Sequence, residues 1–198
     1  MIKKSRTGLL LFIAILVAQT NYSQTVTIGT QVWMSKNLDL DKFRNGDSIP
    51  QAKTYEDWKF YQNYSMPTWC YYNFDSINEK HNGKLYNWYA VNDERGLAPK
   101  GYHVPAIAEW KVLTEFMAGE EVTKKNLTIT NNTWFSSLPG GHLNGEGFFS
   151  DIKYRYLWSS SVTNLCQAIV FGLDYEIEET FTFNTDKGDY FFVRCIKD

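Results

Sequence analysis

Short runs of alternating apolar and polar residues occur near both ends of the chain and are typical of strands. Residues 25–38 (TVTIGTQVWMSKNL) alternate on both sides of a Gly-Thr pair, which predicts two short strands or a hairpin. Residues 154–197 contain four more such segments, YRYLWSSS, CQAIVFGLD, EETFTFNTD and DYFFVRCIK, with turn residues between the last three. The run NTDKGD (184–189) is typical of a hairpin turn, so we expect an antiparallel meander here.

Helical spacing appears in the first half. Residues 83–93 place Leu85, Trp88 and Tyr89 on one helical face. Residues 106–118 bring Trp110, Leu113 and Met117 together in the same way, and Gly119 is a natural stop.

Two stretches between the first strands and these helices show no helical spacing. Residues 40–67 are polar and rich in turn residues, which predicts a loop. Residues 68–75 (TWCYYNFD) read as a buried aromatic strand. Helices in the first half and strands in the second predict an α+β domain.

The N-terminus has the layout of a secretory signal peptide, because Lys3, Lys4 and Arg6 precede an apolar run over residues 8–18. This run is shorter than the ~20 residues that span a bilayer. We therefore expect a signal peptide over 1–23, one domain over 24–198 without a transmembrane anchor, and export to the periplasm or the extracellular medium.

The charge of the chain bears on its partners. Removal of the three signal-peptide cations changes the formal charge from −2 to about −5. Nucleic acids and anionic membrane surfaces need a basic protein face, so neither is an expected partner.

The corner GYHVPAIAEW (101–110) precedes the second predicted helix. Pro105 favours an extended residue before it, and Glu109 stands where it can complete half of a capping box at Ala106. His103 is interpreted as a structural residue bonded to backbone, since none of His81, His103 and His142 has a partner at metal-ligand spacing. We therefore predict no metal and no cofactor.

This corner resembles the GWHLPSDAEW segment of the Fibrobacter succinogenes major paralogous domain family. Further pieces agree in order over about 26–198: IGTQVWMSKNL, WCYYN, GKLYNWYAVNDERGLAPKG, FSSLPGG, LWSSS and VRCIKD. The resemblance implies a C-type-lectin-like fold, distantly similar to formylglycine-generating enzymes, with two short helices packed on a twisted antiparallel sheet and the two termini close together.

An odd number of cysteines, Cys70, Cys166 and Cys195, occurs in a chain expected to be exported. Spacing alone leaves all three pairings open. The resemblance implies a bridge to the last strand, for which Cys70–Cys195 is the preferred pair, with Cys166 left as a buried strand residue.

Catalytic residues are not predicted. The formylglycine-generating branch needs two metal-binding cysteines, and the only candidate pair, Cys166 and Cys195, has none of its flanking motifs. A divergent oxidoreductase of this type remains the alternative. The calcium motifs of C-type lectins are also missing, and the acidic residues Asp174, Glu176, Glu178 and Glu179 read as a solvated surface.

The stretch GGHLNGEGFFSDIKYRYLW (140–158) combines glycines, aromatic rings and short polar side chains, as sugar sites do. The candidate ligand-binding residues are His142, Asn144, Glu146, Tyr154 and Trp158. The competing interpretation is an ordinary surface loop with Trp158 in the core. We predict an exported, non-catalytic, metal-independent module that binds a glycan or an envelope or protein ligand; a structural envelope role is a further alternative.

Overall fold

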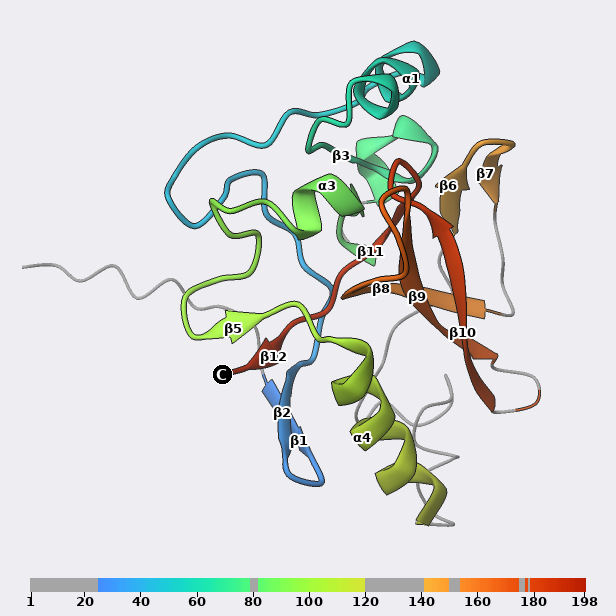
Figure 1. Ribbon diagram of the computed structural model, residues 1–198. Coiled ribbons are helices and arrows are strands. Elements are labelled where there is room, and N and C mark those ends of the chain that lie inside the picture. The colour runs from blue at the N-terminus through green and yellow to red at the C-terminus, as the bar shows by residue number, and fades with distance from the viewer. Residues whose placement is uncertain (1–24, 79–81, 120–140, 150–153, 175–176, 178) are drawn as a thin grey trace, which may run out of the picture.

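The computed structural model describes residues 25–78, 82–119, 141–149, 154–174, 177 and 179–198 (Figure 1). The predicted signal peptide lies outside these residues. Within the described ranges, no helix is both long and apolar enough to cross a membrane.

Two sheets form most of the fold. The smaller one has the strand order β1-β2-β12-β5, with β1 (Thr25–Ile28), β2 (Gln31–Met34), β5 (Tyr102–His103) and β12 (Ile196–Lys197). The first and last described strands therefore lie in the same sheet.

The larger sheet has eight strands in the order β10-β9-β8-β11-β4-β3, with β6 paired to β11 and to β7. Their bounds are β3 (Trp69–Cys70), β4 (Leu85–Asn87), β6 (His142–Asn144), β7 (Gly147–Phe149), β8 (Tyr154–Val162), β9 (Gln167–Asp174), β10 (Glu179–Asp186) and β11 (Tyr190–Phe192). The helices are α1 (Tyr55–Asn63), α3 (Trp88–Val91) and α4 (Ile107–Gly119), with 3₁₀ turns at Tyr72–Phe74 and Ser76–Asn78. The predicted α+β class is confirmed.

Strands β8, β9 and β10 form the predicted antiparallel meander. The run 184–189 is not a hairpin turn, however, because the next strand does not pair with β10. Instead β11 inserts between β8 and β4 and runs parallel to β8, which makes the sheet mixed. All three residues of β11 are buried, and a strand that is apolar on both faces fits the centre of a sheet better than its edge.

The first-half predictions are partly wrong. The predicted helix over 83–93 is β4 followed by the single turn α3, and the strand expected over 68–75 is only β3. The change from strand to helix occurs at Asn87, whose side-chain oxygen accepts hydrogen bonds from the backbone N–H of Ala90 at 3.1 Å and of Thr68 at 3.0 Å. Helix α4 confirms the prediction over 106–118 to within one residue at each end.

Helix α1 lies in the region predicted to be a loop. Thr54 and Asp57 form a complete capping box: the Thr54 hydroxyl accepts from the Asp57 N–H at 3.1 Å, and the Asp57 carboxylate accepts from the Thr54 N–H at 3.2 Å. Trp58 is the one buried residue of α1. A helix with so few buried apolar positions has no clear helical spacing in its sequence, so the pattern did not predict it.

Removal of this cap gives a first prediction. Thr54→Ala is expected to lower the free energy of unfolding by about 1 kcal/mol, because the N–H of Asp57 loses its partner. Urea denaturation measures the change, and Thr54→Ser, which keeps the hydroxyl, is the matched control. Equal stability of the alanine and serine variants would contradict the role of the cap.

Alternation along the central strands divides the core between the two sheet faces. The cluster on one face packs against α3 and includes Trp69, Tyr86, Trp158, Val170 and Phe191. The cluster on the other face includes their sequence neighbours Cys70, Leu85, Leu157, Phe171 and Phe192. Trp58 of α1 and Trp110 of α4 belong to this second cluster. Figure 1 shows α3 and α4 in separate parts of the molecule, with the sheet strands between them.

Candidate functional site

The sheet face that carries α3 continues beyond the core into half-exposed aromatic side chains. We refer to five of them as the aromatic face: Tyr154 and Tyr156 of β8, Phe181 and Phe183 of β10, and His142 of β6. Phe181 is the most open of the five, with 37% of its surface exposed. Large apolar side chains at a surface mark binding sites when they lie together.

Strand register places these rings side by side. Gly172 of β9 pairs with Tyr156 on one side and with Phe181 on the other. A Cβ atom at position 172 would lie only 2.5 Å from the Phe181 ring, so the absence of a side chain lets that ring lie across β9. One row further, Val170 separates Trp158 from Phe183.

The rings support one another at ordinary aromatic distances. Ring centroids lie 5.8 Å apart for Tyr154 and Tyr156, 6.2 Å for Tyr156 and Phe181, and 5.5 Å for Tyr156 and Phe183. His142 meets Tyr156 edge-on at 5.0 Å and stacks on the buried Phe191 at 5.2 Å. The aromatic face is therefore a packed surface with fixed ring positions.

The structure brings together three of the five candidate residues. His142 and Tyr154 belong to the aromatic face, and Asn144 lies two residues after His142, on the same side of β6. The Asn144 side-chain oxygen accepts from the Glu146 N–H at 2.8 Å, which shapes the β6–β7 turn. Glu146 is exposed at this turn, beside the face and outside its rings.

Trp158 is a core residue, contrary to its prediction as a ligand contact. Its side chain is 0% exposed, and its indole N–H donates to the backbone oxygen of Tyr86 at 2.7 Å. A ligand has no access to this ring. The competing interpretation of Trp158 is confirmed.

The sequence analysis did not predict three residues of the aromatic face, Tyr156, Phe181 and Phe183, although the sequence around the two phenylalanines is informative. The segment ETFTF places a phenylalanine at every second position, which puts both rings on one face of a strand. The identity of that face, open rather than buried, depends on what covers the sheet.

Carboxylates border one end of the aromatic face. Asp174 pairs in register with Tyr154 on one side and with Glu179 on the other. Glu176 and Glu178, also assigned to the acidic surface, lie outside the described residues. In the described part of the chain, no three His, Cys, Asp or Glu side chains are grouped to hold a metal ion.

His103 bonds to two carboxylates rather than to backbone, which corrects the predicted partner. Its Nδ1 lies 2.8 Å from Oδ1 of Asp198, and its Nε2 lies 2.7 Å from Oε1 of Glu109. Partial burial lowers the pKa of His103, but the hydrogen bonds and charges of both carboxylates outweigh it and raise the pKa above its usual value. The other Glu109 oxygen accepts from the Ala106 N–H at 2.8 Å, so the half capping box is confirmed.

The predicted Cys70–Cys195 disulfide is wrong, since both cysteines are free and buried. They belong to the two different core clusters, Cys70 with the α4 side and Cys195 with the α3 side. Cys166 is exposed rather than buried. Burial raises the pKa of the Cys195 thiol to about 12, so this thiol keeps its proton at neutral pH.

A family model for the Fibrobacter succinogenes major domain matches residues 26–197. The chain belongs to this family. The match begins in β1 and ends in β12, so the Fibrobacter succinogenes major domain includes both sheets and the aromatic face. No curated protein and no solved structure matches the chain.

Proposed function

We propose that this protein is an exported, non-catalytic binding module that holds a glycan on its aromatic face without a metal ion. The half-exposed rings of Tyr154, Tyr156, Phe181 and Phe183 carry this proposal. Sugar rings present CH groups that pack on aromatic faces, while their hydroxyl groups need polar partners nearby. The Tyr154 hydroxyl and the Asn144 side chain supply such partners.

The ligand expected is a neutral glycan. Glu179 is exposed beside the aromatic face, and the formal charge of the exported chain is about −5, so an acidic polymer would meet repulsion. The same charge disfavours nucleic acid as a partner. A C-type-lectin-like fold is part of this proposal.

Rigid scaffolding supports binding at this surface. Every ring of the aromatic face lies on a strand. The buried rings of Phe191 and Trp158 support this face from the core, and their two centroids lie 4.8 Å apart. Rings already held in place lose little conformational freedom when a ligand binds. The protein therefore offers a preformed surface.

Retention on insoluble polysaccharides tests the proposal. The purified protein is passed over cellulose, chitin, xylan and a β-glucan, with and without EDTA, and we expect retention on at least one of them that EDTA does not change. Phe181→Ala and Tyr154→Ala are each expected to weaken binding about fivefold, since one aromatic contact contributes about 1 kcal/mol. Phe60→Ala is the control, because Phe60 is 50% exposed on α1 and outside the aromatic face.

Either of two results would reject a glycan ligand on the aromatic face: absence of retention on every polysaccharide, or equal losses for Phe181→Ala and Phe60→Ala. Absence of retention would favour a protein ligand or a structural role in the envelope. Loss of retention in EDTA would reject metal independence.

A further inference from the structure

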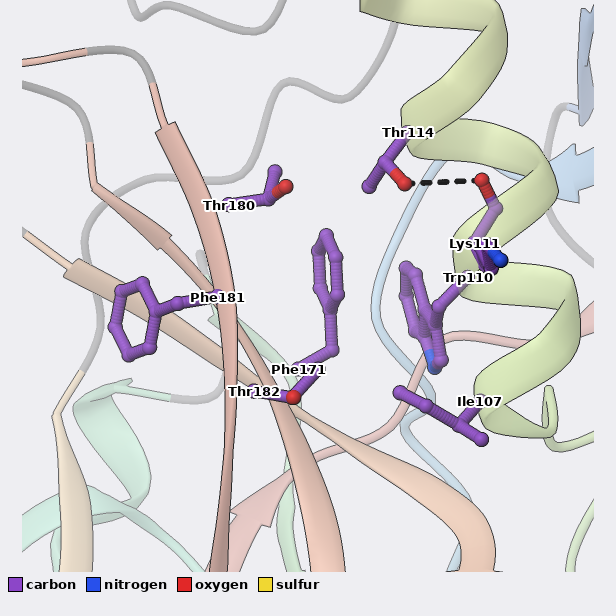
Figure 2. Close-up of a pocket in the computed structure, with 8 residues that line it drawn as sticks. All are labelled: Ile107, Trp110, Lys111, Thr114, Phe171, Thr180, Phe181 and Thr182. Carbon is purple, nitrogen blue, oxygen red and sulfur yellow. Dashed lines mark hydrogen bonds between the residues drawn. The ribbon is translucent and has the colours of Figure 1, made fainter.

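Strand β10 separates the aromatic face from a groove on the opposite side, between β10 and helix α4 (Figure 2). The groove has a volume of about 310 Å³. Figure 2 shows the Phe181 ring pointing away from Phe171 and Trp110, whereas Thr180 and Thr182 lie toward the helix. Phe181 lines the groove at its edge although its ring points to the aromatic face, so the two surfaces meet at this residue of β10.

Packing of α4 on the neighbouring strand creates this groove. Trp110 of α4 stacks on Phe171 of β9 with a centroid distance of 4.3 Å and an interplanar angle of 7°. Strand β10 is the edge strand next to β9, on the side away from β8. Its short side chains Thr180 and Thr182 face the helix. Threonine side chains do not fill the space that the Trp110–Phe171 pair holds open.

Chemically, the groove has an apolar floor and a polar rim. Trp110 and Phe171, which are 1% and 4% exposed, form the floor with Ile107. The hydroxyl-bearing side chains of Thr114, Thr180 and Thr182 line the rim. The Thr114 hydroxyl donates to the backbone oxygen of Lys111 at 2.9 Å, so toward a ligand it acts as an acceptor, whereas a threonine hydroxyl in general can donate one hydrogen bond and accept others.

Among the described residues that line the groove, Lys111 supplies the one charged side chain and none carries a carboxylate. Its ammonium group lies 3.7 Å from the Glu115 carboxylate, and the two side chains are 74% and 66% exposed. Exposed pairs of this kind are weak, so Lys111 is available to an anionic ligand.

We propose that this groove binds a single acidic sugar unit, a hexuronate. Its carboxylate pairs with Lys111, its hydroxyl groups bond to Thr114, Thr180 and Thr182, and its CH groups contact the apolar floor. The volume lies at the lower end of the ~300–1,000 Å³ range of small-molecule sites, which fits one ring rather than an oligomer. This site differs from the aromatic face in place and in ligand charge, and neither proposal depends on the other.

Titration of the purified protein with free galacturonic and glucuronic acid, followed by NMR chemical shifts at neutral pH and low salt, tests this site. At least one uronate is expected to bind saturably and about fivefold or more tightly than galactose, glucose or acetate, because only the uronates engage both rim and lysine. Lys111→Gln should weaken this binding about five- to tenfold, while Lys111→Arg retains it. Lys100→Gln, which removes an exposed lysine elsewhere, is the matched control.

Two further variants separate the groove from the aromatic face. The double variant Thr180→Val, Thr182→Val keeps β-branched side chains of nearly the same shape and should abolish measurable uronate binding while the strand is retained. Tyr154→Ala, at a residue of the aromatic face that does not line the groove, should leave uronate binding unchanged, even where it reduces retention on a polysaccharide. The site is rejected if neither uronate binds, if acetate binds as tightly, or if Lys111→Gln behaves like Lys100→Gln.

Discussion

Trp158→Ala is expected to lower the free energy of unfolding by about 3–5 kcal/mol, the range for removal of a buried aromatic side chain. The indole ring is 0% exposed and meets Phe191 edge-on at 4.8 Å, at the centre of the core cluster on the α3 side. The substitution leaves a cavity between β8 and β11 that surrounding residues cannot fill without moving the sheet. Urea denaturation measures the loss.

The indole hydrogen bond can be separated from the ring. Trp158→Phe keeps most of the apolar volume but leaves the backbone oxygen of Tyr86 without the donor it has at 2.7 Å, which costs about 1–3 kcal/mol. Phe60→Ala, at an exposed ring on α1, should change stability by less than about 0.5 kcal/mol. If Trp158→Ala instead retained full stability and lost ligand binding, Trp158 would be a ligand contact rather than a core residue.

Stability is also expected to fall as pH rises from about 4 to 8, because two groups hold protons more tightly in the folded protein than in the unfolded chain. Burial raises the pKa of Asp189 from 3.8 to about 6, although a hydrogen bond from Thr185 opposes this. At a pH between these two pKa values, Asp189 holds a proton in the folded protein that it has lost in the unfolded chain. A difference of this size lowers the free energy of unfolding by about 3 kcal/mol across that interval.

His103 adds a second decrease at higher pH. Its pKa is raised in the folded state, so the stability from its bonds to Asp198 and Glu109 is fully present below the unfolded pKa of about 6.5 and is lost as pH rises through the folded pKa. Asp93 acts in the opposite direction at low pH. The hydrogen bond from Arg95 lowers the pKa of Asp93, so its contribution is lost as pH falls through that lowered pKa.

A urea denaturation series from pH 4 to 8 measures both steps. Asp189→Asn should flatten the curve between pH 4 and 6, and His103→Gln should flatten it above about 6.5. Each variant serves as the control for the other, because the two groups titrate in different intervals. A wild-type curve that rises with pH over this range would contradict both assignments.

Local patterns identified much of the fold in advance. Alternation in residues 25–38 and 154–186 was sufficient for β1, β2, β8, β9 and β10, since strand period depends on the sequence of each segment alone. Helix α4 was also predictable, because Trp110, Leu113 and Met117 repeat at helical spacing and Gly119 follows. Family membership came from ordered motifs.

Contacts between distant segments decided the rest. Strand β11 has no local feature that separates a hairpin partner from a central strand, and its position depends on burial by β8 and β4. Cys70 and Cys195 fall on opposite core clusters because of register, which cysteine spacing does not encode. His103 finds Asp198 only when β5 and β12 pair.

The sequence by itself determined the α+β class, the main strands and helix, and a polar and aromatic segment with His142, Asn144 and Tyr154 as candidates. Only the tertiary structure decided that Trp158 is internal and that Phe181 and Phe183 complete the open surface. The physical reason is that alternation assigns residues to two sides of a strand, whereas exposure depends on which side the rest of the chain covers. Here Trp158 lies in the core cluster that includes α3, whereas Tyr154 and Phe181 lie outside that cluster.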